Sequence, residues 1–377
     1  MSRRIVKIEA APLDLQLKEP FAISGGESSR VDLTLVRMEL SDGTVGLGEA
    51  APFPAYDGQT RTAALEALAR AAPALIGLDP LLSHRIQQSA IEAAPGSSSA
   101  LCALEMAAFD GFTRLQQLPL HRYVGSANAA LVTDLTIVAG DLDHASRCAR
   151  EASDAGFKTL KIKVGRDGLD HDLQRLEMIS RAAPGCGLVL DANGGFEAAE
   201  AQQLIEKALA ERIPIDMLEQ PVPQEDEEGM ARLTALGQVA ICADESCKSA
   251  ADAMRIVQHR LANVINIKTQ KCGVLEAIRI HQIATAAGIT LMMGGMVESL
   301  LSMSFSAHLA RGLGGVRWID LDTPLFIREH PFVGGIEFDG GSVTLDEQRS
   351  GHGVDLSPGS DAFPAPSWKT LAEENGT

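Results

Sequence analysis

The feature that most constrains this chain is a series of charged residues that end short apolar segments at nearly regular intervals. The series consists of Lys161, Lys163, Asp191, Glu219, Asp244 and Lys268. From Lys163 on, successive members are 24 to 28 residues apart, which is about the length of one strand plus one helix. Because the carboxyl ends of parallel barrel strands open on one face, we expect these side chains to meet at one mouth.

Alternating strand and helix patterns from residue 133 onward predict a barrel. Eight apolar segments alternate with amphipathic helical patterns, at 133–138, 159–164, 187–191, 215–219, 240–244, 264–268, 289–293 and 316–320. Eight such steps imply a closed parallel barrel rather than an open sheet. No eighth helix is evident after Asp320, so we expect a (β/α)7β-type modified TIM barrel in an α/β protein.

The rest of the chain predicts a second unit. Residues 5–17 and 31–50 have strand patterns, with an Asp-Gly hairpin turn at 41–44, and helical patterns follow at 59–73, 80–92 and 98–117. We expect an N-terminal α+β capping domain (1–125), a catalytic barrel (126–324) and a C-terminal segment (325–377) that packs back on the cap. The polar, Pro/Ser-rich residues 357–377 are expected to be loosely ordered.

Composition excludes several classes of protein. A net charge of −17 argues against nucleic acid or an anionic membrane as a partner. No apolar run approaches the roughly 18 residues of a membrane span, and the N-terminus runs straight into a strand pattern, so we expect no signal peptide. The six cysteines form no CxxC motif, and we interpret them as reduced thiols of a cytoplasmic protein.

The lysines of the series suit acid–base chemistry. Lys161 and Lys163 are two apart on one strand, so their side chains share a face, and each ammonium should lower the pKa of the other. A solvated strand end would explain this pair alone, but not the acids that follow it. Lys268 ends strand six, opposite strand two in an eight-stranded barrel. Two bases on opposite sides of one carbon suit inversion next to a carboxylate.

The acids of the series suit a metal. Asp191, Glu219 and Asp244 end strands three, four and five, and a hard cation such as Mg²⁺ prefers oxygen ligands of this kind. Each acid alone could be a helix cap or a loop residue, whereas three at successive strand ends favour a shared cation. That cation would stabilise an enediolate formed by proton removal. Asp320 and Asp322 end strand eight and could hold a cationic group, or could be a solvated pair.

At this point the sequence resembles the enolase superfamily, its muconate-lactonizing subgroup, and within it the dipeptide epimerases. The resemblance covers roughly residues 5–356. The phrases that carry it are GFKTLKIKVG, LDANGGF, LEQPV, ADES, INIKTQKCGV, MMGGMVES and WIDLDTPL. His281 and His308 lie in helical patterns outside these phrases and are interpreted as structural or surface residues.

The resemblance implies roles for these residues. Lys163 and Lys268 would be the two acid/base groups, and Lys161 would adjust the pKa of Lys163 and contact the substrate carboxylate. Asp320 and Asp322 would bind the α-ammonium group of a dipeptide. One Mg²⁺ per subunit would be bound by Asp191, Glu219 and Asp244. Further substrate contacts are expected from Thr136, Gly295, Met296, Val297 and Glu298.

The specificity loops depart from one branch of the family. Ala-Glu epimerases carry an arginine shortly after a Pro-Phe pair in the first loop, and here Gly26 holds that place, two residues after Ser24. We therefore expect an enzyme that is not specific for Ala-Glu. The second loop contributes Phe53 and Tyr56, whose aromatic surface suits an apolar contact.

The leading hypothesis is a Mg²⁺-dependent dipeptide epimerase that inverts the C-terminal residue's α-carbon by two-base 1,1-proton transfer, in a homo-oligomer. The same lysines and acids would also serve an N-acylamino-acid racemase, a succinylbenzoate synthase or a muconate-type cycloisomerase. The Asp320–Asp322 pair separates these, because an acylated substrate has no ammonium group. A barrel that only binds a small molecule is the alternative from another class, and it needs no paired bases.

Overall fold

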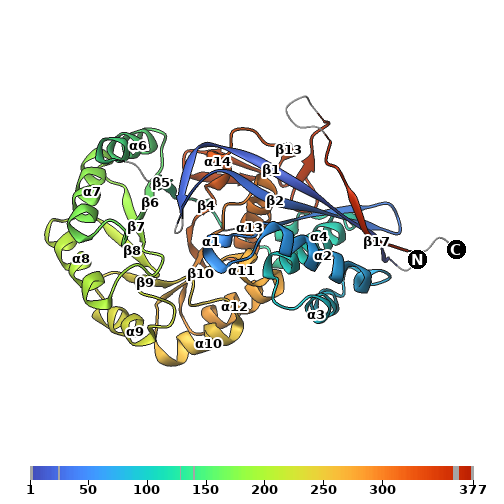
Figure 1. Ribbon diagram of the computed structural model, residues 1–377, viewed down its shortest axis with the longest axis horizontal. Helices are drawn as coiled ribbons and strands as arrows, with labels where there is room; N and C mark the ends of the chain where they lie inside the picture. The colour runs from blue at the N-terminus through green and yellow to red at the C-terminus, as the bar shows by residue number, and fades with distance from the viewer. Residues whose placement is uncertain (1–2, 24–25, 128, 139–140, 360–364, 375–377) are drawn as a thin grey trace.

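The structure is a computed structural model that describes residues 3–23, 26–127, 129–138, 141–359 and 365–374. A parallel barrel, surrounded by helices, stands beside a capping unit built on antiparallel strands (Figure 1). In the described part of the chain, none of the helices has both the length and the apolar character that crossing a bilayer requires.

Eight strands form the barrel in chain order, all parallel. They are β5 (Leu135–Ile137), β6 (Thr159–Lys163), β7 (Gly187–Asp191), β8 (Ile215–Glu219), β9 (Ala240–Ala243), β10 (Val264–Ile267), β11 (Thr290–Met293) and β12 (Val316–Ile319). The first and last strands meet, since Thr133 forms a parallel bridge with Ile319. Each strand lies within its predicted range, and the predicted (β/α)7β-type barrel is confirmed.

Helices cover the outside of the barrel, so its strands are buried on both faces; all four residues of β10 are buried. The helices are α6 (Leu142–Asp154), α7 (Leu169–Ala182), α8 (Ala198–Ala210), α9 (Glu227–Leu236), α10 (Ala250–His259), α11 (Thr269–Cys272), α12 (Val274–Ala286) and α13 (Leu300–Leu313). After β12 only a single turn follows, α14 (Thr323–Phe326), in place of an eighth long helix. This turn begins right after Asp322, so the Asp320–Asp322 segment stays at the mouth.

The capping unit is an antiparallel sheet with helices on one side. Its strand order is β17-β1-β2-β3, with β1 (Ile5–Ile23), β2 (Gly26–Leu40), β3 (Val45–Ala50) and β17 (Lys369–Glu373). Its helices are α1 (Pro54–Asp57), α2 (Arg61–Leu75), α3 (Ser83–Ala93), α4 (Ser98–Leu115) and α5 (Leu120–Val124). The predicted hairpin turn joins β2 to β3, and Gly43 takes the positive φ of 86° that an Asp-Gly turn favours.

The C-terminal segment joins the two units. Short strands pair with each other and with the start of the barrel: β4 (Leu131–Val132), β13 (Phe332–Gly334), β14 (Ile336–Asp339), β15 (Ser342–Leu345) and β16 (Val354–Leu356). Our expectation of a loosely ordered tail is wrong for residues 369–373, because β17 pairs with β1 and supplies hydrogen bonds that an edge strand otherwise lacks. The domain boundaries at 125/126 and 324/325 stay predictions.

The β1–β2 hairpin reaches from the capping sheet toward the barrel (Figure 1). Lys18 Nζ donates to the Leu325 carbonyl at 2.7 Å, and Leu17 forms an antiparallel bridge with Ile327. The Glu19 carboxylate lies 3.7 Å from the ring of His144 in α6. These contacts hold the hairpin on both sides of the point where β5 and β12 meet.

The cap is also fixed at the end of β3, next to the barrel mouth. The Gln270 side chain accepts a hydrogen bond from Ala51 N and donates one to the Glu49 carbonyl, both at 3.0 Å. The buried Glu49 carboxylate accepts from Ser299 N and the Ser299 hydroxyl, at the start of α13. Burial raises the pKa of Glu49 to about 8.

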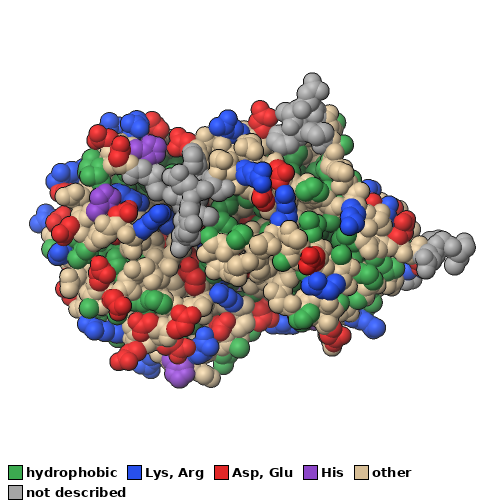
Figure 2. Space-filling model, viewed as in Figure 1, with side chains coloured by type: hydrophobic (Ala, Val, Ile, Leu, Met, Phe, Trp, Pro, Cys, Tyr) green, Lys and Arg blue, Asp and Glu red, His purple; other side chains and the backbone are tan. Residues whose placement is uncertain are grey.

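Two features of the composition can be followed in the structure, the charged side chains on the surface and the six cysteines. On the face drawn in Figure 2, acidic and basic side chains of the described residues are interspersed, and no continuous basic area is visible. All six cysteines are unpaired, and five of them are buried.

Three histidines are buried between the cap and the barrel. His308 Nδ1 accepts from His121 N at 3.2 Å, and the ring of His352 lies 3.2 Å from the Leu47 carbonyl. Burial, and then the neighbouring rings of His121 and His352, hold the pKa of His308 well below its usual range. Burial likewise lowers the pKa of His121 and of His352. The structural interpretation of His308 fits this position.

We predict that this cluster makes stability fall in mild acid. Below the ordinary histidine pKa of about 6.5 the unfolded chain takes up protons that the folded chain refuses, so the free energy of unfolding decreases as pH falls. Each such histidine contributes up to about 1.4 kcal/mol per pH unit. Urea unfolding at pH 7.5 and 5.5 should show a smaller loss for His308→Gln than for the wild type.

The exposed His259→Gln in α10 is the matched control and should keep the wild-type loss. Equal losses in the wild type and in His308→Gln would contradict the prediction.

Candidate active site

The charged series lies at the carboxyl ends of neighbouring barrel strands, as expected. Parallel pairing sets Lys163 beside Asp191, and Asp191 beside Glu219. Asp244 directly follows β9 and Lys268 directly follows β10. The regular spacing in sequence is therefore a repeat of one strand and one helix around a single mouth.

Lys161 is the centre of the charge arrangement. Its Nζ lies 2.7 Å from Asp320, 2.9 Å from Glu219 and 3.1 Å from Asp191. These carboxylates come from β7, β8 and the segment after β12, so one ammonium group connects both sides of the barrel. The Lys161 side chain is 4 % exposed, and its charge is balanced almost entirely by these acids.

The pKa expected for Lys161 was wrong in direction. We expected the neighbouring ammonium of Lys163 to lower it. Burial does act to lower the pKa of Lys161, but the carboxylates of Asp320, Glu219 and Asp191 outweigh burial and raise that pKa well above the usual range. Lys161 is therefore held as a cation at the mouth.

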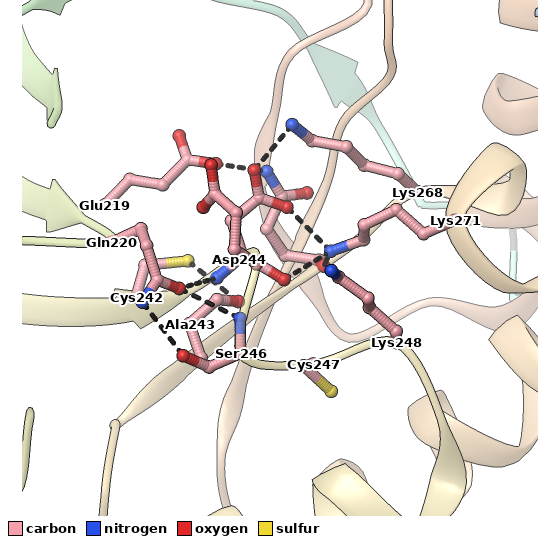
Figure 3. A network of polar contacts seen from close by, with 12 residues as sticks. Glu219, Gln220, Cys242, Ala243, Asp244, Ser246, Cys247, Lys248, Lys268 and Lys271 are labelled. Atoms are coloured by element: carbon pink, nitrogen blue, oxygen red, sulfur yellow. Dashed lines mark hydrogen bonds and ion pairs between the residues drawn. The ribbon is translucent and has the colours of Figure 1, made fainter. Parts of the chain in front are cut away.

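Asp244 is held by two lysines (Figure 3). Its carboxylate lies 2.7 Å from Lys268 Nζ and 2.6 Å from Lys271 Nζ. Burial alone would raise the pKa of Asp244, but the two lysines outweigh it, so its pKa lies well below the usual range. The side chain of Gln220 accepts from Asp244 N at 3.0 Å and fixes the backbone there.

Lys163 occupies the other side of the mouth. Its Nζ donates to Asp191 at 2.7 Å and to Asn193 Oδ1 at 2.8 Å, and its side chain is 30 % exposed. Asn193 in turn donates to Glu245 at 3.1 Å. Strands β6 and β10, which place Lys163 and Lys268, are four apart in an eight-stranded barrel. The two amines thus face the same space from opposite sides.

A cavity opens at this mouth, with about 530 Å³ of empty space that includes the part open to solvent. Its walls combine Lys163 and Lys268 with aromatic and backbone surfaces, and the described lining residues are Phe53, Tyr56, Thr136, Lys161, Lys163, Asn193, Lys268, Gly295, Met296, Val297, Asp320, Asp322 and Thr323. Almost all of the substrate contacts predicted from the sequence therefore line one space.

One predicted substrate contact has a different place. Glu298 does not line the cavity: it is fully buried, with Oε1 accepting from Met296 N at 2.6 Å, so it supports the wall from behind. In the first loop, Gly26 lies in β2 opposite Ile23, and Ser24 is outside the described residues. Gly295 lines the cavity, but its missing side chain serves packing, because a Cβ there would lie 2.2 Å from Met303 Cε.

Asp320 and Asp322 belong to one wall of the cavity. Asp322 Oδ2 accepts from Thr136 N at 2.6 Å, across the joint between β12 and β5. Burial, and then the charge of Asp320, raise the pKa of Asp322 to about 7. Such a pair favours a cationic partner, because a positive charge would relieve the repulsion between the two acids.

The residues at β7, β8 and β9 fit a divalent cation. Asp191, Glu219 and Asp244 are fully buried. One oxygen of Glu219 accepts from Asn266 Nδ2 at 2.6 Å, whereas Oε2 accepts no hydrogen bond and has Lys161 Nζ at 2.9 Å. Buried carboxylates at three successive strand ends are the kind of oxygen donors that Mg²⁺ prefers.

Two family models match the chain. Residues 144–360 match the enolase C-terminal domain-like family, and residues 6–125 match the N-terminal domain of mandelate racemase / muconate lactonizing enzyme. The chain belongs to the mandelate racemase / muconate lactonizing enzyme family.

Individual relatives narrow the comparison within the family. An aromatic dipeptide epimerase from Herpetosiphon aurantiacus is 45% identical, over 95% of this chain and all of the relative. A crystal structure of a mandelate racemase/muconate lactonizing protein from the same species has a TM-score of 0.92, at 44% identity over 95% of this chain and all of that one. A dipeptide epimerase from Enterococcus faecalis, in complex with Mg and L-Leu-L-Tyr, has a TM-score of 0.90, at 32% identity over 93% of this chain and 99% of that one.

Sequence reasoning missed several residues of this family site. The sequence analysis gave no role to Lys271, which contacts Asp244, or to Asn193, which contacts Lys163. Both residues lie inside the motif phrases INIKTQKCGV and LDANGGF. The signal was present as polar residues next to predicted strand ends. Asp134, which lies beside Asp320 and Asp322, had no such signal because it precedes its strand.

We predict that Glu219→Gln weakens Mg²⁺ binding by more than about tenfold, because it removes one anionic ligand from the set. Isothermal titration with Mg²⁺ measures this without any substrate. Asp216→Asn is the matched control, since Asp216 lies in the same strand but is exposed, and it should bind as the wild type does. Unchanged affinity in Glu219→Gln would place the metal elsewhere.

Proposed function

We propose that the chain is a Mg²⁺-dependent dipeptide epimerase that inverts the α-carbon of the C-terminal residue. The observation that carries this proposal is that one cavity is lined both by amines from opposite strands, Lys163 and Lys268, and by the Asp320–Asp322 pair. The amines can move a proton, and the acids can hold the far end of the substrate. The dipeptide epimerases among the relatives support this assignment.

Asp191, Glu219 and Asp244 would hold the Mg²⁺. When bound, the cation would supply positive charge beside the substrate carboxylate, and so stabilise the negative charge that develops as the α-proton leaves. Lys161, which the surrounding acids keep protonated, would add a second positive charge on the same side. The carboxylate end of the substrate is thereby fixed at the floor of the cavity.

The proton then moves between two lysines. With the α-carbon between them, the lysine that faces the α-hydrogen takes it as a neutral amine, and the opposite lysine delivers one as an ammonium. The direction of transfer depends on which epimer is bound, so Lys163 and Lys268 exchange roles between the two directions. Both reach the cavity, which general acid–base catalysis requires.

The Asp320–Asp322 pair selects a dipeptide rather than an acylated amino acid. A free α-ammonium group has three N–H donors, and the two buried carboxylates at the wall supply acceptors for it. An N-acyl substrate would bring no second cation to the pair, which would then have only Lys161, beside Asp320, to offset two buried acids.

The walls near the capping unit favour an apolar or aromatic C-terminal side chain. Phe53, Tyr56, Met296 and Val297 line the cavity. The described lining residues include no arginine that could meet a glutamate, in agreement with Gly26 in the first loop. We infer that dipeptides ending in an aromatic or large aliphatic residue are the substrates. A cytoplasmic location and a homo-oligomer stay predictions, and light scattering after size exclusion tests the latter.

We predict loss of the C-terminal α-proton signal when L,L-dipeptides are incubated with the enzyme and Mg²⁺ in D₂O, followed by proton NMR. Leu-Tyr-like members should exchange and members ending in Glu should not. Lys163→Ala and Lys268→Ala should each reduce epimerisation by about 10²–10⁴-fold, because each removes one of two required proton carriers.

The exposed Lys207→Ala in α8 is the control and should retain full activity. Wild-type epimerisation by Lys268→Ala would refute the two-base scheme. Turnover of N-acyl amino acids alone would keep the site but discard the dipeptide assignment.

We predict that Asp320→Asn combined with Asp322→Asn raises the KM for dipeptides by about tenfold or more, since two charge-assisted hydrogen bonds to the ammonium are weakened. Any activity on N-acyl amino acids should change little. Steady-state kinetics with one dipeptide and its N-acetyl derivative measure both effects. An equal loss on the two substrates would show that the pair acts on the carboxylate end instead.

A further inference from the structure

Asp134 is a buried acid to which the proposed reaction gives no role. It is 2 % exposed, and among the described residues neither of its carboxyl oxygens has a hydrogen-bond partner. It lies directly before β5, two residues ahead of Thr136, which lines the cavity. A fully buried carboxyl without partners is costly, so its position calls for a partner or a proton.

Three carboxyl groups meet at this point. Asp134, Asp320 and Asp322 each offer an oxygen, and these oxygens lie within 4.8 Å of one another. Like charges so close in a buried place disfavour full ionisation. Of the charged groups that act on Asp134, two are these aspartates, one is Lys161, and one is Glu219.

The ammonium of Lys161 offsets only part of the negative charge of this cluster. It lies 2.7 Å from Asp320, but the same ammonium is also shared with Asp191 and Glu219. Its single positive charge therefore cannot balance three further acids. One proton within the cluster is the simplest way to reduce the remaining charge.

The backbone fixes Asp134 against the pair. Asp134 N donates to the Ile319 carbonyl at 2.9 Å, and Leu321 N donates to the Thr133 hydroxyl at 2.9 Å. Together with the bond from Thr136 N to Asp322, these contacts hold residues 133–136 against 319–322. Asp320 and Asp322 line the cavity whereas Asp134 does not, so Asp134 touches the pair from outside the cavity lining.

We propose that Asp134 is a positioning residue that carries a proton and donates it, as an O–H hydrogen bond, to the Asp320–Asp322 pair. This hydrogen bond holds the Asp320–Asp322 pair in place. The pair itself then stays ionised and can bind a primary ammonium group. This inference rests on the proposed dipeptide substrate. Burial, followed by the charges of Asp320 and Asp322, raises the pKa of Asp134 well above its usual range, in agreement with a retained proton.

Two substitutions test the kinetic consequence. Asp134→Asn keeps the shape and an N–H donor, so kcat/KM for a dipeptide should stay within about threefold of the wild type at neutral pH. Asp134→Leu removes the donor, so KM should rise about tenfold with a smaller change in kcat, as expected for one hydrogen bond to a charged group. The KM of the N-acetylated dipeptide should not change in either variant.

Difference infrared spectroscopy tests the proton itself. The difference between the wild-type and Asp134→Asn spectra at neutral pH should contain the carbonyl stretch of one protonated carboxylic acid, whereas the bands of other buried acids such as Glu49 are common to both proteins and cancel. Thr133→Val is the matched control, because it removes the hydrogen bond to Leu321 N at the same joint and should keep the band.

Either of two results would overturn the inference. One is an Asp134→Asn variant that is as impaired for dipeptides as Asp134→Leu, which would mean that Asp134 acts as an anion. The other is a band that Asp134→Asn retains. The infrared result does not depend on turnover, so it tests Asp134 even if no dipeptide is epimerised. If either result is found while the enzyme still epimerises dipeptides, the inference about Asp134 fails and the proposed function stands.

Discussion

The site depends on charge compensation among lysines and carboxylates that are buried together at the barrel mouth. None of these groups could be buried alone, because an unpaired charge in the interior is strongly unfavourable. Lys161 connects acids from opposite sides of the barrel, and Lys268 and Lys271 neutralise Asp244 from two directions. The same contacts that make burial tolerable also fix each side chain in place. Preorganisation for proton transfer is therefore a consequence of how the barrel satisfies its interior charges.

The repeated part of the fold and the closed barrel could be predicted from the sequence, but the side-chain contacts across the joint that closes the barrel could not. Each strand and helix unit is local, so the positions of Asp191, Glu219 and Asp244 follow from spacing alone. The pKa of Lys161 depends instead on Asp320, which arrives from the far end of the barrel. Thr136 and Asp322, which form a hydrogen bond, are 186 residues apart, and no periodicity indicates such a contact. The same closure explains why Asp134 had no signal.

The specificity surface is built by two units that are fixed to each other at the mouth. Phe53 and Tyr56 follow β3, and the end of β3 is bonded to Gln270 and Ser299 of the barrel. The aromatic wall is thus set by a joint to the segments after β10 and before α13 rather than by a free loop. The Tyr56 ring lies 5.8 Å from Lys268 Nζ, so the side-chain pocket and one of the bases share a boundary. A change of substrate preference at this wall therefore also changes the surroundings of the base.

The two proposed bases, Lys163 and Lys268, are not equivalent, although the proposed reaction places one carbon between them. Lys163 is 30 % exposed and shares its ammonium with Asp191 and Asn193, whereas Lys268 is 7 % exposed, bonded to Asp244 and close to the Tyr56 ring. A proton held by the more exposed amine can be replaced from water more readily than one held by the enclosed amine. The barrel symmetry places the bases opposite each other, but the capping unit covers them unequally. The direction of epimerisation thus determines which base, the open or the enclosed one, receives the substrate proton.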